Sequence, residues 1–295
     1  MFIEMGNLYY IIYIIISIAV VLSSVWFLKN KSKTFRFWFI FGFLIVGFVF
    51  HFAKIFIYPY NSLSTSVLFR KISLENISAV STVFFPFIYL SKNKVLKDYM
   101  IIGGMIGGIS AILFPIDAIS STFDGMIDYW RKPAFSIDVI RFYYIHIMSF
   151  LVPFLMMHFK MHEFDVKRIY KVFFVFIGVL TIVFLNELLI TLFGWVSVEE
   201  LFQYDSRNPS FIFGIKPEFE SKATLLLIFV PKIFKFNPFT GNPQYWPIIW
   251  MIIPIFIYGS VIILAFQLIY NHKQVKDVFF NLTMNKNCDS SEKNK

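Results

Sequence analysis

The stretch SLENISAVSTVFFPFIYL, residues 73–90, carries its charged and amide side chains at one end only. Glu75, Asn76 and Ser78 lie near its start, and the remainder is mostly apolar to Leu90. Its length approaches the roughly 20 helical residues that cross a bilayer core. Polar side chains at membrane depth usually face a bundle interior or a wet cavity. We therefore expect the polar end to open into a pocket near the outer face of a membrane protein.

The composition excludes an ordinary soluble domain. Hydrophobic residues make up 58% of the 295 residues and charged residues only 15%, which is far from soluble averages. The one cysteine, Cys288, lies in a polar tail, so an internal disulfide and a thiolate metal cluster are excluded. We expect an integral membrane protein with no cofactor and no metal site.

Seven apolar runs are long enough, or nearly so, to cross the membrane as helices: 8–28, 36–58, 74–90, 99–116, 137–158, 170–193 and 247–270. Helix is expected throughout, because lipid offers no partner to open backbone groups. The prediction is an all-α fold, a polytopic transmembrane bundle of seven spans over residues 1–270. Residues 194–246 are expected to form an external, lid-like loop. The composition of residues 271–295 predicts a polar, disordered cytoplasmic tail.

Basic residues gather in alternate loops, which predicts the orientation. They follow the first, third and fifth runs, as Lys29, Lys31, Lys33 and Arg36, as Lys92, Lys94 and Lys97, and as Lys160, Lys167 and Arg168. The positive-inside rule makes these loops cytoplasmic, with the N-terminus outside and the C-terminus inside. This topology accounts for most of the net charge of +9, so no nucleic-acid partner is expected. We expect a multi-pass protein of the cell membrane.

Most polar groups inside the spans fall in the outer half of the predicted bilayer. At about 1.5 Å of rise per residue, Ser78 lies about 6 Å, Asn186 about 10 Å and His146 about 13 Å from the outer end of its span. The candidate catalytic residues are Ser78 and His146. The candidate substrate-binding or supporting residues are His51, Glu75, Asn76, Asp138, Arg141, Asn186 and Glu187.

Each of these residues also has a structural explanation. Lys54, Arg141 and Glu187 are within reach of the interface and can place their charges there. Ser78 can serve in helix packing, as small hydroxyls often do in membranes. His146 is the hardest to explain structurally, because a deep imidazole needs partners. The clustering across several spans, and not any single residue, indicates a site.

Two further patterns predict packing and an interfacial cluster. In IIGGMIGG, Gly103 with Gly107 and Gly104 with Gly108 form small-xxx-small pairs, which allow close approach of a neighbouring helix. In HFKMHE, His158 and His162 lie one turn apart, as metal ligands can. No second such motif accompanies them, so we interpret this segment as a polar cluster at the cytoplasmic interface.

The segments ENISAVSTVFFPFIYLSKNKVLKDY, GGISAILFP, IRFYYIHIMSF, FLNELL and NPSFIFGIKP, in this order, resemble the YwaF-like family of bacterial integral membrane proteins. The resemblance covers about residues 70–260 and implies a seven-span bundle. An animal relative of that family is an acyltransferase that acts on phospholipids through a cysteine and a histidine. A more remote group of membrane lipid hydrolases uses a threonine with a histidine. The resemblance therefore also implies lipid acyl chemistry.

The chain departs from that family at the start of the third span. There the family places proline, histidine and cysteine on alternate positions, which read Leu74, Asn76 and Ser78 here. A serine can replace the cysteine as nucleophile only when a base activates it.

The hypothesis that follows gives Ser78 the attack on a lipid ester and His146 the proton. Asn76 and Asn186 would stabilise the oxyanion, and Glu75 or Asp138 would orient the imidazole. The alternative is a non-enzymatic protein that binds or transports lipids or small molecules on the same fold, with the catalytic residues lost. Membrane lipids are the expected partners in either case.

Overall fold

The computed structural model describes residues 1–120, 122–123, 127–128, 131–205, 207–221 and 223–292. Long helices dominate the fold: α1 (Leu8–Leu28), α2 (Lys33–Ala53), α4 (Ile77–Leu90), α5 (Lys94–Leu113), α7 (Ile137–His158), α8 (Val172–Leu192) and α11 (Ile249–Glu292). Short α-helices are α3 (Thr65–Ile72), α6 (Ile116–Ile119), α9 (Pro217–Glu220) and α10 (Thr224–Leu227). The 3-10 turns are η1 (Lys54–Phe56), η2 (Tyr60–Ser62), η3 (Ile169–Lys171), η4 (Val198–Glu200), η5 (Pro209–Phe211) and η6 (Lys232–Phe234). The strands β1 (Thr122–Phe123) and β2 (Ile127–Asp128) form one antiparallel hairpin.

Side-chain caps fix where many of the helices begin. Asn7, Ser32, Asn76, Asn93 and Ser136 each accept a hydrogen bond from a backbone N–H of the first turn of the helix that follows. Such a cap satisfies one of the amides that a helix start leaves without a partner. The local sequence therefore sets these boundaries.

Six helices are long and apolar enough to cross a membrane: Leu8–Leu28, Lys33–Ser62, Lys94–Leu113, Ile137–His158, Ile169–Leu192 and Ile249–Asp277. The remaining predicted span, 74–90, is part of a bent pair in which α3 and α4 meet at 51°. The described residues thus contain six candidate spans, or seven if the bent pair counts as one. The multi-pass membrane class and the all-helical character expected from the sequence are confirmed.

The helix α5 packs against α7 at the centre of the bundle through two glycines. A Cβ on Gly104 would lie 2.7 Å from the carbonyl oxygen of Ser149, and one on Gly108 would lie 2.7 Å from that of His146. A Cβ on Gly107 would meet nothing within 4 Å, and one on Gly103 would meet only the ring of Tyr99. One of the two predicted glycine pairs therefore makes the close helix contact.

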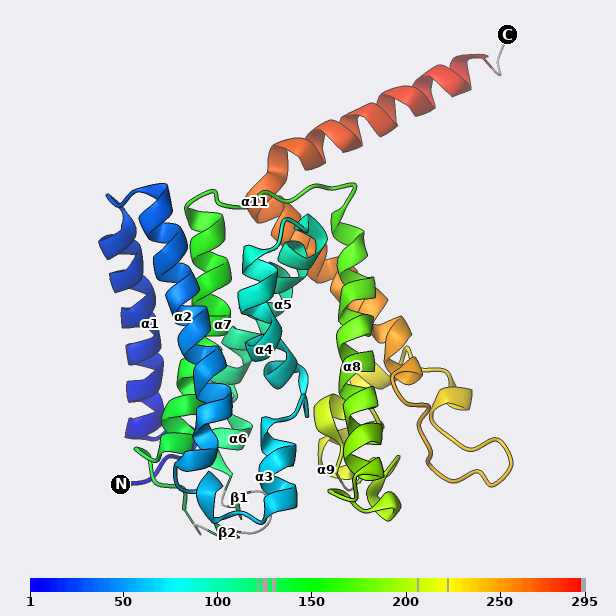
Figure 1. The fold of residues 1–295 in the computed structure, drawn as a ribbon. Helices are drawn as coiled ribbons and strands as arrows, with labels where there is room; N and C mark the ends of the chain where they lie inside the picture. The colour runs from blue at the N-terminus through cyan, green and yellow to red at the C-terminus, as the bar shows by residue number, and fades with distance from the viewer. Residues whose placement is uncertain (121, 124–126, 129–130, 206, 222, 293–295) are drawn as a thin grey trace.

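The other helices surround this central pair. The helix α1 joins α7 through Tyr13, whose ring stacks on that of Tyr143 at a centroid distance of 4.1 Å. The helices α2, α4 and α8 also contact the α5–α7 pair, and α11 contacts α8 at one edge (Figure 1). The N-terminus lies at the end of the bundle that holds α3, and the C-terminus lies beyond the opposite end (Figure 1).

The helix α11 extends past the predicted end of the last span. It continues from residue 270 to Glu292 through Asn271, whose backbone is non-helical. The disorder expected for residues 271–295 from their composition stays a prediction, and residues 293–295 lie outside the described part of the chain.

Candidate functional site

The polar end of the stretch 73–90 is the break between α3 and α4. Asn186 on α8 bridges this break, since its Oδ1 accepts from the backbone N–H of Leu74 at 3.1 Å and its Nδ2 donates to Ser73 Oγ at 3.1 Å. Asn76 then caps α4 by accepting from the N–H of Ala79 at 2.8 Å. A membrane segment with an open backbone needs such partners from its neighbours. Some of the polar residues of this stretch therefore stabilise the break between α3 and α4.

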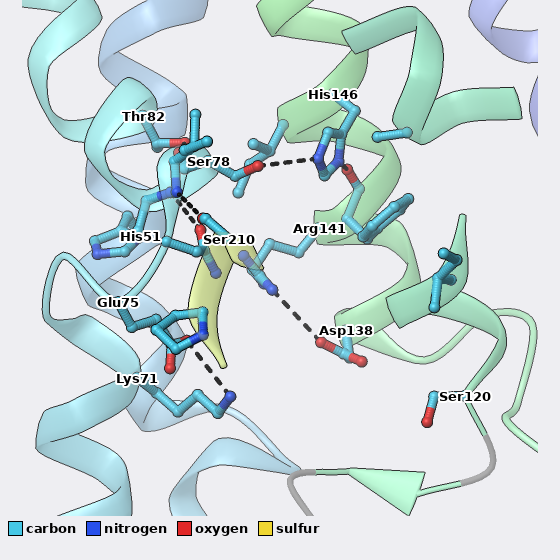
Figure 2. A pocket seen from close by; sticks show the side chains of 18 of the residues that line it. His51, Lys71, Glu75, Ser78, Thr82, Ser120, Asp138, Arg141, His146 and Ser210 are labelled. Atoms are coloured by element: carbon cyan, nitrogen blue, oxygen red, sulfur yellow. Dashed lines mark hydrogen bonds and ion pairs between the residues drawn. The ribbon is translucent and has the colours of Figure 1, made fainter. Parts of the chain in front are cut away.

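Beyond the cap, Ser78 on α4 faces His146 on α7 across the bundle (Figure 2). The distance from Ser78 Oγ to His146 Nε2 is 3.4 Å. The other ring nitrogen, Nδ1, lies 2.7 Å from the carbonyl oxygen of Phe142. Because a carbonyl only accepts, Nδ1 carries the proton, and in the neutral ring Nε2 is left as an acceptor. The backbone of α7 thus holds the tautomer that can accept the proton of the Ser78 hydroxyl.

Ser78 and His146 line a cavity of about 710 Å³ at the end of the bundle that holds α3 (Figure 2). Seven of the nine candidate residues line it: His51, Glu75, Asn76, Ser78, Asp138, Arg141 and His146. Asn186 and Glu187 lie outside the lining, where Asn186 supports the break and Glu187 binds Arg207. The geometry therefore brings together groups from α2, α4 and α7 that are far apart in the sequence.

One wall of the cavity is centred on Asp138. Its Oδ1 accepts from the Tyr60 hydroxyl at 2.7 Å, and its Oδ2 accepts from Lys132 Nζ at 2.8 Å. Arg141 lies one turn further along α7, with Nη2 3.6 Å from Asp138 Oδ1 (Figure 2). Lys54 at the end of α2 lies near the same group, with its Nζ 5.4 Å from the centroid of the Tyr60 ring. Cations therefore outnumber the carboxylate on this wall.

A second ion-pair group joins the long loop to the broken span. Arg207 Nη2 lies 2.9 Å from Glu187 Oε1 on α8 and 3.6 Å from Glu75 Oε2 in the break. Lys71 Nζ on α3 lies 3.4 Å from Glu75 Oε1. Glu75 therefore binds basic residues instead of the imidazole of His146.

The loop that follows α8 forms another wall of the cavity. Asn208 folds it, because its Nδ2 donates to the carbonyls of Tyr204 and Gly214 and its Oδ1 accepts from the N–H of Phe213 at 2.9 Å. The fold places Ser210, at a φ of 52°, against the start of α4, where Ser210 Oγ accepts from the N–H of Ile77 at 3.0 Å. The lining residues of this loop thus lie between positions 207 and 219, whereas none of the described residues of the apolar segment 221–236 lines the cavity.

The structure shows which groups four of the candidate residues contact. The oxygen of Asn76 caps α4, while both polar groups of the Asn186 amide hold the break, outside the cavity lining. Asp138 binds Tyr60 and Lys132, and the group behind the imidazole is the Phe142 carbonyl. His51 has its Nε2 3.0 Å from the carbonyl oxygen of Ile72, at the end of α3.

Several lining residues were not among the candidates drawn from the sequence: Lys54, Tyr60, Lys132, Arg207 and Ser210. Lys54 has an interfacial position in the sequence, which favoured a solvent-facing side chain, but only 3% of its surface is exposed. Arg207 and Ser210 lie in the predicted lid, and the segment NPSFIFGIKP at residues 208–217 was their available signal.

The opposite end of the bundle has a closed polar cluster. Asp98 on α5 accepts from His162 Nε2 at 2.6 Å and from Arg168 Nε at 2.6 Å. These hydrogen bonds raise the pKa of Arg168 above its ordinary value, so the guanidinium stays charged. His158 instead stacks on Phe154. Within the described residues, no group of three His, Cys, Asp or Glu side chains is arranged to hold a metal ion.

A comparison with protein families assigns the chain. The model of the TMEM164 family matches residues 3–206. The chain belongs to the TMEM164 family. The matched range contains both Ser78 and His146, whereas the cavity-lining loop of residues 207–219 begins just after it. No curated protein and no solved structure matches the chain.

Proposed function

We propose that this member of the TMEM164 family transfers or hydrolyses lipid acyl groups with Ser78 as nucleophile and His146 as base. The observation that supports this proposal is the Ser78–His146 pair, 3.4 Å apart, in which the Phe142 carbonyl fixes the tautomer. Ser78 is exposed to a cavity large enough for part of a lipid. A nucleophile, a base and a group that orients the base are the elements that hydroxyl-based acyl transfer requires.

The reaction proceeds in two steps. Ser78 Oγ attacks the ester carbonyl carbon while its proton passes to His146 Nε2, and the tetrahedral intermediate collapses as this proton moves to the leaving alcohol. The acyl-serine is then attacked by water, in hydrolysis, or by the hydroxyl of a second lipid, in transfer. His146 accepts the proton of that attacking group and returns it to Ser78 Oγ, which restores the enzyme.

The start of α4 supplies the group that stabilises the oxyanion. The N–H of Ile77 is bound by Ser210 and that of Ala79 by Asn76, but the N–H of Ser78 has no acceptor in the described part of the chain. An amide at this position of a helix has no partner within the helix, and the helix dipole favours negative charge there. The Ser78 N–H therefore takes the oxyanion role that the sequence assigned to Asn76 and Asn186.

The proposal includes the membrane arrangement expected from the sequence. The bent pair α3 and α4 counts as the third of seven spans, the N-terminus is outside and the protein resides in the cell membrane. An odd number of spans puts the two termini on opposite sides, in agreement with their positions at opposite ends of the bundle (Figure 1). The cavity then opens toward the outer leaflet, at the level of lipid ester groups.

A serine-reactive probe tests the reaction. The purified full-length chain in lipid nanodiscs is treated with a fluorophosphonate, and release or transfer of a labelled acyl chain from a diacyl lipid is followed in parallel. We expect Ser78→Ala to abolish labelling and His146→Ala to slow acyl release at least about 100-fold, the usual contribution of a general base. Ser81→Ala, which removes a buried hydroxyl on the same helix outside the cavity lining, is the matched control. Equal labelling and equal acyl release in all four proteins would refute the proposal.

A second candidate function is non-enzymatic binding of a lipid or small molecule in the same cavity. The observation that favours this function is that His146 Nδ1 binds the Phe142 carbonyl. A backbone carbonyl stabilises a protonated imidazole less than a carboxylate does, which makes His146 a weaker base. In that case wild type and Ser78→Ala bind lipid equally and neither releases an acyl chain.

A further inference from the structure

Lys54 is a buried cation without a counter-ion. Its side chain lines the cavity, only 3% of the residue is exposed, and within the described chain its Nζ forms neither a hydrogen bond nor an ion pair. Its observed contact is with the Tyr60 ring, 5.4 Å from Nζ to the centroid. A cation over an aromatic face recovers only about 0.5–2 kcal/mol, less than the cost of burying an unpaired charge. Lys54 is therefore poorly satisfied by the protein alone.

Arg141 faces the same ring. Its guanidinium carbon lies 5.4 Å from the Tyr60 centroid, and its Nε is buried without a hydrogen-bond partner among the described residues. Figure 2 shows the guanidinium extending from α7 into the space between Ser210 and Asp138. Two cations from different segments of the chain thus lie near one tyrosine, and both side chains line the cavity.

The nearby carboxylates are already occupied. Asp138 is held by Lys132 and the Tyr60 hydroxyl at 2.8 Å and 2.7 Å, and its separation from Arg141 is a longer 3.6 Å. Glu75 is paired with Lys71 and Arg207. An added anion between Lys54 and Arg141 would remove their mutual repulsion and supply the missing acceptors, so the arrangement is complementary to a negatively charged ligand group.

We propose that Lys54 and Arg141 form a binding site for an oxyanion, of the phosphate type, beside the Ser78–His146 pair. The inference rests on the proposed function in one respect, since it takes this cavity as the ligand site and names the charge of the ligand. The oxyanion has two sources, the headgroup of a lipid or free phosphate. Binding at Lys54 does not require the Ser78 hydroxyl, so the two proposals are separable.

The test measures binding in a Ser78→Ala background, in which acyl chemistry cannot consume the ligand. The full-length chain is titrated in nanodiscs with lysophosphatidic acid, with a monoacylglycerol of the same chain length and with inorganic phosphate. We expect lysophosphatidic acid to bind at least about tenfold more tightly than the monoacylglycerol, as a charge-assisted contact provides. Competition by inorganic phosphate identifies a free anion as a second ligand, and its absence assigns the site to the lipid headgroup.

Variants locate the site. Lys54→Met and Arg141→Met should each reduce the preference for the charged lipid to about twofold or less, and Lys54→Arg should retain it because the charge stays. Lys97→Met is the matched control, since Lys97 lies outside the cavity, near the Tyr89 ring. Lys54→Gln with size-exclusion chromatography replaces Lys54→Met if the latter misfolds.

Equal affinity for the two lipids in the unsubstituted site, or an unchanged preference in the folded Lys54 variants, would overturn the oxyanion site. Absence of acyl release from the wild-type protein, with the preference for the charged lipid intact, would refute only the proposed function.

Discussion

Asp98 near one end of the bundle and Asp138 near the other are both buried carboxylates with cationic partners, but their surroundings differ. Asp98 is fully buried and its two oxygens are bound by Arg168 and His162, so the charges at this end are paired. Around Asp138, the cations Lys132, Arg141 and Lys54 crowd one carboxylate beside an open cavity. A closed ion pair supports the fold, whereas unused donors that face a cavity indicate a ligand.

The largest loss of stability is expected at the end of the bundle that holds Asp98. Asp98→Ala leaves Arg168 without its carboxylate and should lower the free energy of unfolding by about 3–5 kcal/mol, as breaking a buried pair does. Denaturant titration of the purified protein, followed by tryptophan fluorescence, measures this. Asp165→Ala serves as the control, because it removes a carboxylate of the same α7–α8 loop that accepts from the backbone N–H of Lys167 and not from the Arg168 side chain. A loss below about 1 kcal/mol for Asp98→Ala would contradict the closed ion pair.

The next largest loss of stability is expected at the contact between α5 and α7, two helices that run between the two ends of the bundle. Gly108→Ala places a Cβ 2.7 Å from the His146 carbonyl oxygen and should cost about 1–3 kcal/mol by overpacking. It should also reduce acyl release, because it displaces the helix that carries His146. Gly107→Ala has open space around its Cβ and is the matched control. Similar stability of the two variants would show that the helices do not approach so closely in the membrane.

Removing the side chain that supports the helix break should lower the free energy of unfolding by a similar or smaller amount. Asn186→Ala removes the acceptor of the Leu74 N–H and the donor to Ser73, which should cost about 1–2 kcal/mol of stability. Hydrogen exchange at Leu74 should rise in the variant and stay unchanged at residues of α1. Unchanged exchange at Leu74 would mean that α8 does not hold the break.

The smallest effect, opposite in sign, is expected at Lys54. Removing a buried charge that has no counter-ion should leave the ligand-free protein as stable or raise its stability by up to about 1 kcal/mol in Lys54→Met. The same denaturant titration measures it, with Lys132→Met as the contrasting variant, since Lys132 pairs with Asp138 and its loss should destabilise. A clear loss of stability in Lys54→Met would place Lys54 with the structural charges and remove the contrast between the two ends.

Much of the fold was predictable because it depends on local composition. Apolar runs of span length predicted the membrane helices, and the glycines of IIGGMIGG predicted a close helix contact. The third span was predicted as one segment from residue 74, but the helix α4 begins at Ile77 after a 51° bend. The polar residues near its start marked this bend, yet the partner that satisfies its backbone, Asn186, is more than 100 residues away in the sequence.

The sequence by itself determined the membrane class, the helices, the capping residues and the grouping of polar residues near one end of the spans. These properties follow from residue type and spacing along one helix. Only the tertiary structure decided that the imidazole of His146 is oriented by the Phe142 carbonyl, that Asn186 supports the helix break and that Lys54 and Arg141 both lie near the Tyr60 ring. The reason is physical, because the choice of partner for a buried polar group depends on which helices pack together, and that packing is set by the whole bundle.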